Sequence, residues 1–236
     1  MTSRRVGILG GSFDPIHLGH LDAGAAAQRA LGLTRIVVLP SSMPPHRAQP
    51  VASSYHRFAM VALAIVGRPG WQVLDLEMRA AMRSYTSDTL KSFHADGFRA
   101  AELFFIAGAD AFVEIATWKD YPGLLDLAHF AVISRPGTPV SQLPARLPAL
   151  APRMHPPTAA ADPSSTLIYL IDSPTADVSS TAIRRACAAY EPIADMVAAA
   201  VQQHIEQHDL YQDAATARQS GDGLASWPAG RLHGQS

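Results

Sequence analysis

Two histidines with the spacing needed to act on one anion stand near the start of the sequence. His17 and His20 are three residues apart and follow a glycine pair that closes a short apolar run. The Ala-rich residues 19–31 favour a helix, and a helix that begins near residues 16–18 places both imidazoles on one face of its first turn. Backbone N–H groups and the helix dipole favour an anion at that position. Two unrelated surface histidines are the alternative, but the spacing favours a shared ligand.

The glycine pair, Gly10-Gly11, indicates what the anion is. Residues without a side chain let a phosphate approach the backbone closely at the carboxyl end of a strand, where open α/β sheets bind ligands. A dinucleotide-binding dehydrogenase would have G-x-G-x-x-G after this strand, and a P-loop would have Gly-Lys-Ser/Thr. Neither pattern is present. The segment therefore predicts a phosphate site of another kind.

A second motif, SSTAIR at residues 179–184, has the composition of a helix start beside a charge. Ser179, Ser180 or Thr181 can cap the helix, and Arg184 lies about one turn further on, where its guanidinium can bind phosphate oxygens in pairs. Alone, the motif is typical of a simple cap. Together with the histidines, the motif predicts a triphosphate-binding site in which SSTAIR lines the second side.

The elements that must position these motifs alternate between apolar runs and amphipathic segments. This alternation is typical of βαβ units. The first strands are apolar at every position, which indicates a parallel sheet covered on both faces. The alternation predicts an α/β fold with a doubly wound, mostly parallel sheet and C-terminal helices. Strands are expected near residues 5–10, 35–40, 71–74, 102–106, 130–134 and 166–172, and helices near 19–31, 53–66, 86–97 and, in two pieces, 180–211.

One domain is expected over residues 1–212. Within it, residues 136–164 are rich in Pro and Ala without periodicity and are interpreted as a loop, while residues 180–211 form the C-terminal helical part. The tail, residues 213–236, has few apolar anchors and is expected to be disordered.

Composition excludes several classes of protein. The 236 residues include 19 Lys+Arg and 20 Asp+Glu, a formal net charge of −1, so no basic surface is expected for a nucleic acid or an anionic membrane. Cys187 is the single cysteine, and no apolar run approaches the roughly 18 residues of a membrane span. A cytoplasmic protein is expected. The oligomeric state, a homo-oligomer included, is left open.

The motifs GGSFDPIHLGH, residues 10–20, and SSTAIR resemble those of the HxGH nucleotidyltransferases. Four further segments resemble the bacterial nicotinate mononucleotide adenylyltransferases within that superfamily. They are PSSMPPHR at 40–47, SYTSDTL at 84–90, FIAGADAFVEIATWKDY at 105–121 and HIEQHDLY at 204–211. The resemblance thus extends from about residue 5 to 211 and implies a Rossmann-like nucleotidyltransferase fold.

The resemblance implies a reaction of ATP with nicotinate mononucleotide that yields the deamido dinucleotide and pyrophosphate. Mg²⁺ is expected with ATP and not in a carboxylate cage of the protein. The implied catalytic residues are His17, His20 and Arg184. The residues implied to bind ATP are Gly10, Gly11, Ser12, Phe13, His17, His20, Gly108, Asp110, Arg135, Ser180, Thr181 and Arg184. Those implied to bind the mononucleotide are Ser41, His46, Arg47, Tyr85, Thr86 and Trp118.

Three alternatives remain at this point. The acceptor could be nicotinamide mononucleotide or phosphopantetheine, or the chain could be a nucleotide-binding sensor without turnover. Before SYT the chain has Ala80, Met82 and Arg83, where the family usually has a Gly or Ala followed by Pro, so the acid or amide preference is not fixed by the motif.

Overall fold

The fold is built on a seven-stranded sheet in which all neighbouring strands are parallel. The computed structural model describes residues 4–42, 49–79, 84–159 and 165–212, and within them the strand order is β3-β2-β1-β4-β5-β7-β6. The strands are β1 (Val6–Gly11), β2 (Arg35–Pro40), β3 (Trp71–Val73), β4 (Leu103–Gly108), β5 (His129–Ile133), β6 (Met154–His155) and β7 (Ile168–Ile171). The predicted parallel α/β fold is confirmed.

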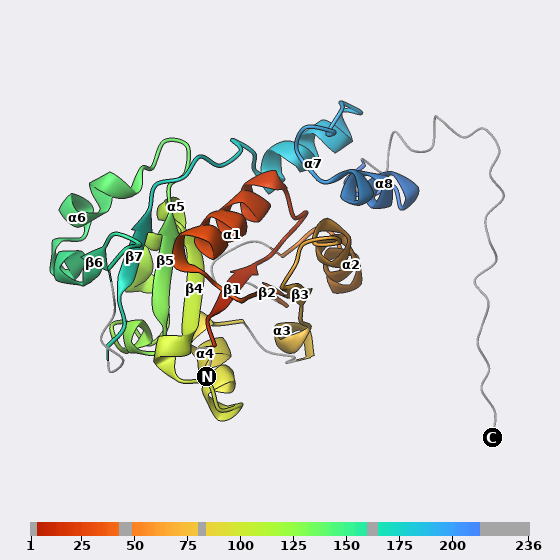
Figure 1. Cartoon of the computed structure of the whole chain (residues 1–236). Coiled ribbons are helices and arrows are strands. Elements are labelled where there is room, and N and C mark those ends of the chain that lie inside the picture. The colour runs from red at the N-terminus through yellow and green to blue at the C-terminus, as the bar shows by residue number, and fades with distance from the viewer. Residues whose placement is uncertain (1–3, 43–48, 80–83, 160–164, 213–236) are drawn as a thin grey trace, which may run out of the picture.

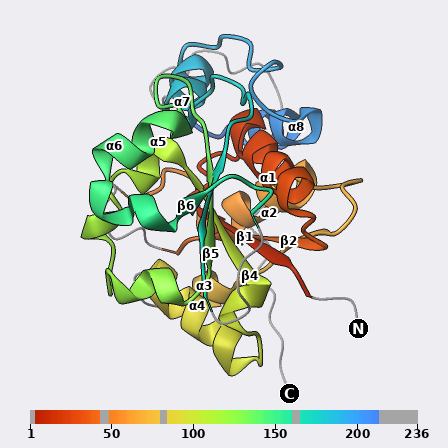
Figure 2. The same ribbon diagram turned by 60° about the vertical axis from the view of Figure 1, so that its left-hand side comes forward.

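Helices cover both faces of this sheet. Figure 2 shows α1, α2 and α8 on one side and α5 and α6 on the other. The α-helices are α1 (Leu18–Leu31), α2 (Ser54–Ala64), α3 (Leu76–Arg79), α4 (Thr86–Ala95), α5 (Ala109–Phe112), α6 (Leu143–Arg146), α7 (Ser180–Ala188) and α8 (Ala199–Gln207). Short 3₁₀ turns are η1 (Ala100–Glu102), η2 (Ile115–Thr117), η3 (Gly123–Asp126), η4 (Val140–Gln142) and η5 (Pro148–Arg153).

The two faces of the sheet form two hydrophobic clusters, because successive strand residues point to opposite sides. Ile36 and Val38 of β2 face the cluster that includes α1, α2, α7 and α8. Val37 and Leu39 of the same strand face the cluster that includes α4, α5 and α6. This explains why the sequence pattern of β2 is apolar at nearly every position.

The order in which strands are added to the sheet reverses at β1. β1 pairs with β2 on one side and with β4 on the other, so the first crossover leads one way along the sheet and a later one leads the other way. Open α/β sheets bind ligands beyond the carboxyl ends of strands at such a switch point. In Figure 1 the C-terminal helices α7 and α8 lie together beyond α1 and beside α2, so this part of the chain returns to the same region.

Helix α1 starts and stops where the sequence pattern predicts. Its N-cap, His17, has an extended backbone with φ −144° and ψ 171°. Its C-cap, Gly32, is left-handed with φ 60°, a conformation that glycine adopts without a steric penalty.

The interpretation of residues 136–164 as a loop is wrong for most of the segment. It contains η4, α6, η5 and the strand β6, which pairs in parallel with β7, while residues 160–164 lie outside the described part. Pro occupies the first turn of both α6 and η5, where its missing N–H costs nothing. Each helix has only one or two turns, which is too short for a periodic pattern, yet Val140, Leu143 and Leu150 are buried.

Two other expectations concern the C-terminal part. The second of the two helical pieces expected within residues 180–211 begins only at Ala199, as helix α8, and Ile193 and Val197 are buried from the irregular backbone that precedes it. The tail predicted over residues 213–236 lies outside the described residues. Among the helices that the structure describes, none is long and apolar enough to cross a membrane.

Candidate active site

The two histidine side chains converge as their spacing predicts. The rings of His17 and His20 are stacked with centroids 3.7 Å apart and planes inclined by 28°. The backbone N–H of His17 donates to Nδ1 of His20 at 3.3 Å. A neutral His20 therefore carries its proton on Nε2, which makes that nitrogen a hydrogen-bond donor.

His17 is a buried and uncharged member of this pair. Its side chain is 4% exposed, and Nδ1 has no hydrogen-bond partner among the described residues. Burial, with a smaller contribution from the positive charge of Arg135, lowers the pKa of His17 from 6.5 to about 4. At neutral pH His17 can offer a hydrogen bond to an anion, but not a positive charge.

The ring of the buried Phe13 packs against the ring of His20. Phe13 is 1% exposed, has a positive φ of 47°, and meets His20 edge-on at 5.0 Å between ring centroids. A Cβ atom at Gly11 would come within 3.1 Å of the Phe13 ring. Any side chain at position 11 would therefore press on the Phe13 ring, whereas Gly11 lets this loop pack closely and leaves its backbone accessible.

Arg135 supplies a fixed positive charge beside the histidines. Its stem lies against Gly108, where a Cβ atom would be 3.1 Å from Cγ of Arg135, and its guanidinium reaches Gly19 of α1. Nη2 donates to the carbonyl of Val178 at 3.2 Å. Arg135 therefore joins the end of β4, the start of α1 and the segment before α7. The carboxylate of Asp110 lies over Gly108.

The start of α7 is attached to the loop before α1. Ser179 is the N-cap and accepts from the N–H of Ala182 at 3.1 Å. The hydroxyl of Ser180 donates to the carbonyl of Pro15 at 2.9 Å. Arg184 donates to the carbonyl of Asp14 at 2.7 Å and to the hydroxyl of Thr181 at 3.3 Å. The two motifs, more than 150 residues apart in the sequence, thus form one structure.

We call this set the α1 cluster. It comprises Gly10, Gly11, Ser12, Phe13, His17, His20, Gly108, Asp110, Arg135, Ser180, Thr181 and Arg184.

A buried network that sequence reasoning missed holds the α1 cluster in place. The carboxylate of Asp14 accepts from the N–H groups of Val51 and Ala52 at 2.8 and 3.0 Å and from the hydroxyl of Tyr211 at 2.9 Å. Nη1 of Arg184 lies 3.8 Å from the same carboxylate. Burial, followed by the charge of Asp14, raises the pKa of Tyr211, so its hydroxyl remains a donor.

Arg57 is the second missed residue. It is 1% exposed and donates from Nη1 to the carbonyls of Ser12 and Ser41, both at 2.7 Å, and from Nη2 to that of Ser42 at 3.3 Å. Burial lowers its pKa, and the charge of Asp14 opposes that shift. An Arg within the apolar pattern of residues 57–61 was the available signal, because a charge at a core position needs partners.

A second group, which we call the α4 cluster, comprises Ser41, Tyr85, Thr86 and Trp118. The N–H of Ser42 donates to the hydroxyl of Ser84 at 3.1 Å, which joins the loop after β2 to the start of α4. The Ser41 hydroxyl is buried and has no partner among the described residues. Its position beside Gly11, whose carbonyl accepts from the N–H of Ser41 at 2.9 Å, puts it next to the α1 cluster.

Trp118 is half-buried and not a core residue. It meets Phe105 edge-on at 5.8 Å, and the Phe105 ring lies 3.6 Å from where a Cβ atom of Gly10 would be. Lys119 lies 4.8 Å from the centre of the Tyr85 ring. These contacts bring Trp118 and Tyr85 to the same end of the sheet as Gly10. His46 and Arg47, predicted for the same group, lie outside the described residues.

Comparisons with known proteins identify the family of the chain. Residues 8–186 match the family described as cytidylyltransferase-like. A Cronobacter sakazakii protein named "Probable nicotinate-nucleotide adenylyltransferase" is 40% identical over 208 residues, which cover 87% of this chain and 94% of the relative. A Desulfitobacterium hafniense protein of the same name is 37% identical over 89% of this chain and 96% of its own length.

Solved structures share the fold. Nicotinic acid mononucleotide adenylyltransferase of Plasmodium falciparum, complexed with NaAD, is similar with a TM-score of 0.68 at 20% identity, covering 88% of this chain and 97% of that one. The same Plasmodium enzyme complexed with APC gives 0.67 at 19% identity, with the same coverage of both chains. With the sequence matches along most of its length, the chain belongs to the nicotinate-nucleotide adenylyltransferases, within the cytidylyltransferase-like family.

Proposed function

We propose that the protein transfers the adenylyl group of ATP to nicotinate mononucleotide. An oxygen of the 5′-phosphate of the mononucleotide attacks the α-phosphorus, the bond from that phosphorus to the bridging oxygen of the β-phosphate breaks, and pyrophosphate leaves. Nicotinate adenine dinucleotide is the second product. The family assignment and the stacked His17–His20 pair at the start of α1 support this reaction.

The attacking group needs no general base. A phosphate monoester has a second pKa near 6 and is largely a dianion at neutral pH. Catalysis then depends on position and on stabilisation of developing negative charge. This matches a site composed of imidazoles, guanidinium groups and a helix start.

The α1 cluster is proposed to hold the triphosphate. His20, donating from Nε2, and Arg184 act on the α-phosphate, together with the backbone that follows Gly10. His17, neutral by virtue of its pKa of about 4, donates toward the β- and γ-phosphates, and Arg135 adds charge there. Asp110, at the end of β4, is proposed to bind a ribose hydroxyl. Gly108, Ser180 and Thr181 complete this side of the site.

The α4 cluster is proposed to hold the mononucleotide. Trp118 is half-buried and has the position of a stacking surface for the pyridine ring. The first N–H groups of a helix have no partner within it, so those at the start of α4, near Tyr85 and Thr86, are suited to the pyridine carboxylate. Ser41, with its unpartnered hydroxyl, and His46 and Arg47 in the loop that follows are proposed to meet the phosphate or ribose of the same substrate.

Mg²⁺ is proposed to enter with ATP. The donor set around His17 and His20 consists of imidazole and guanidinium groups, which suit phosphate oxygens, whereas Mg²⁺ takes oxygen ligands. The buried carboxylate of Asp14 is already occupied by three hydrogen-bond donors. When bound to the triphosphate, Mg²⁺ would offset the charge of the departing pyrophosphate.

Pyrophosphate release tests the proposal. Purified protein with Mg-ATP is compared on nicotinate mononucleotide, nicotinamide mononucleotide and phosphopantetheine. A preference for the nicotinate form of about tenfold or more, equal to about 1.4 kcal/mol of transition-state binding, is expected. A preference for either other acceptor would replace the proposed substrate, and ATP binding without turnover on any of them would make the chain a nucleotide sensor.

A further inference from the structure

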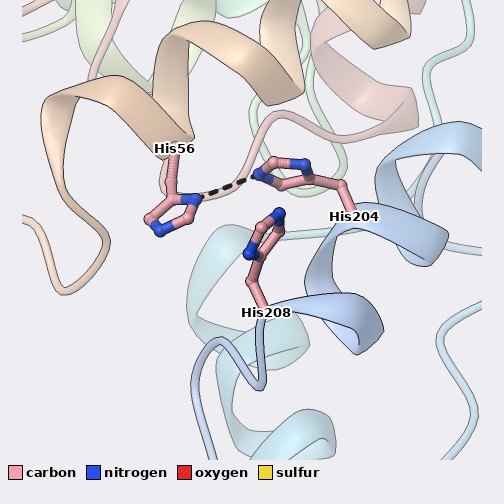
Figure 3. Close-up of side chains that lie close together, drawn as sticks. All are labelled: His56, His204 and His208. Carbon is pink, nitrogen blue, oxygen red and sulfur yellow. Dashed lines mark hydrogen bonds between the residues drawn. The ribbon is translucent and has the colours of Figure 1, made fainter. Parts of the chain in front are cut away.

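Three histidines outside the proposed active site lie where α2 meets α8. His56 comes from the first turn of α2, His204 from the last turn of α8, and His208 from its C-cap. Figure 3 shows the three rings directed toward one another across the junction between the two helices. One ring nitrogen from each lies within 4.8 Å of the other two, and Nδ1 of His56 is 3.1 Å from Nε2 of His204.

The fold itself brings these side chains together. The hydroxyl of Ser53 accepts from the N–H of His56 and so sets the start of α2. His204 and His208 are four residues apart and share one face of α8, while Val201 and Ile205 of that helix are buried in the core. Packing of α8 therefore fixes two of the three rings against the third.

The chemistry of the cluster is that of a nitrogen-donor site. A neutral imidazole has one ring nitrogen with a lone pair for a metal ion, and bound metal would replace the hydrogen bond between Nδ1 of His56 and Nε2 of His204. His56 and His204 are partly buried, and His208 is exposed, which leaves an entry path for an ion.

We propose that His56, His204 and His208 bind one divalent transition-metal ion of the Zn²⁺ type, which fastens α8 to α2. Imidazole suits Zn²⁺, and two histidines four residues apart on a helix with a third from elsewhere form a familiar donor set. A tetrahedral Zn²⁺ with Zn–N bonds of about 2.0–2.1 Å needs nitrogens about 3.3 Å apart. The His56–His204 pair, which is hydrogen-bonded in this structure, already has nearly this separation, and a ring nitrogen of the exposed His208 lies within 4.8 Å of both.

This ion would differ from the Mg²⁺ proposed for ATP in both chemistry and place. Mg²⁺ prefers oxygen ligands, whereas all three donors here are nitrogens.

The two helices that the proposed transition-metal ion joins, α2 and α8, lead to residues that contact the α1 cluster. Arg57, directly after His56, binds the carbonyls of Ser12 and Ser41, and Tyr211, three residues after His208, donates to Asp14. The ion would therefore reinforce the contacts of Arg57 and Tyr211, which hold the loop between β1 and α1.

The test is a titration of the full-length protein, freed of metal with a chelator, with Zn²⁺ by calorimetry and with Co²⁺ by visible absorption. One tight site per chain is expected for the wild type. His208→Ala should weaken it by at least about 100-fold, since outer-shell partners of metal ligands alone account for about 10- to 100-fold. His208 is exposed, so this variant is expected to fold, which circular dichroism checks.

Two matched variants keep the proposal open to refutation. His155→Ala removes a histidine of β6, the strand at the far edge of the sheet, and should leave binding unchanged. His20→Gln removes a histidine of the α1 cluster and should also leave one tight site. Loss of that site in His20→Gln but not in His208→Ala would place the metal at the α1 cluster and overturn the proposal, as would equal affinity in the wild type and His208→Ala.

Thermal unfolding provides a second readout that does not depend on activity. Because Zn²⁺ bound to the folded state alone stabilises it, the Tm of the wild type should rise with Zn²⁺ concentration, while the Tm of His208→Ala should not. Mg²⁺ at the same concentration should move neither. A Tm that responds to Zn²⁺ equally in both proteins would refute the proposed site.

Discussion

The α1 cluster and the α4 cluster meet at one end of the sheet but are held in place in different ways. Buried contacts fix the α1 cluster, with Arg57 spanning two loops and Asp14 accepting three hydrogen bonds. In the α4 cluster Ser41 is also held by Arg57, but Trp118 and the start of α4 are bordered by exposed ion pairs, Lys119 with Asp88 and Lys91 with Asp120. Exposed pairs contribute little to stability. The difference suits their proposed tasks, since charge stabilisation needs fixed groups and acceptor recognition tolerates adjustment.

The largest expected effect is on stability, from Asp14→Ala in the buried network. The substitution leaves the Tyr211 hydroxyl and two backbone N–H groups without their acceptor and the Arg184 guanidinium without its opposite charge, and it should lower the free energy of unfolding by about 3–5 kcal/mol. Urea denaturation measures this change. Asp75→Ala, which removes an exposed partner of Arg79, is the control and should change little. Equal losses in both variants would remove the contrast between buried and exposed contacts.

His20→Ala should lower kcat by about 10²–10³ with little change in either KM, because a donor to developing charge acts mainly in the transition state. Steady-state kinetics with Mg-ATP and nicotinate mononucleotide measures both constants. A variant with near-normal kcat would show that the stacked pair does not act on the α-phosphate.

Acid should weaken the α1 cluster through His17. The folded state takes up this proton only near pH 4, whereas the unfolded chain does so near 6.5, so the unfolded state binds more protons in between. Stability is then present above pH 6.5 and falls as the pH drops toward 4, by up to about 3 kcal/mol. Unfolding at several pH values measures it.

His129 has a pKa lowered to about 4 as well, chiefly by burial, and should contribute a similar slope. His17→Gln should therefore reduce the pH dependence without abolishing it. An identical pH profile for the wild type and His17→Gln would contradict the buried, neutral state of His17.

The smallest expected effect is that of Trp118→Ala in the α4 cluster. Loss of a stacking surface, about 0.5–1.5 kcal/mol, should raise the KM for nicotinate mononucleotide by about two- to tenfold and leave kcat and the KM for ATP nearly unchanged. Titration of each substrate separately checks this. A rise confined to the KM for ATP would move the pyridine site away from Trp118.

The same two clusters show what a sequence can predict. The β1–α1–β2 unit, α4 and α7 follow from local patterns, and the His17–His20 convergence follows from helical spacing. The one-turn helices and the two-residue strand β6 of residues 140–155 are too short for a period to be recognised.

The support of the site was not predictable from local pattern. Asp14 and Tyr211 are 197 residues apart, and Arg57 is 45 residues from Ser12. Such contacts arise only after the sheet has brought distant segments together. Arg57, a charged residue in an apolar pattern, was the available signal. It indicates that a buried charge needs partners but does not indicate which residues they are.

The hydrogen bond from Tyr211 to Asp14 also has a consequence for synthesis on the ribosome. The loop at Ser12–Ile16 emerges early, but its carboxylate receives its last donor only 197 residues later, about 10–40 s at ordinary translation rates. A nascent chain that has made β1 and α1 therefore contains both histidines without the support that positions them. We expect that the proposed phosphate site is completed only at the end of translation and that a truncation before Tyr211 leaves a folded sheet with a loosely held loop.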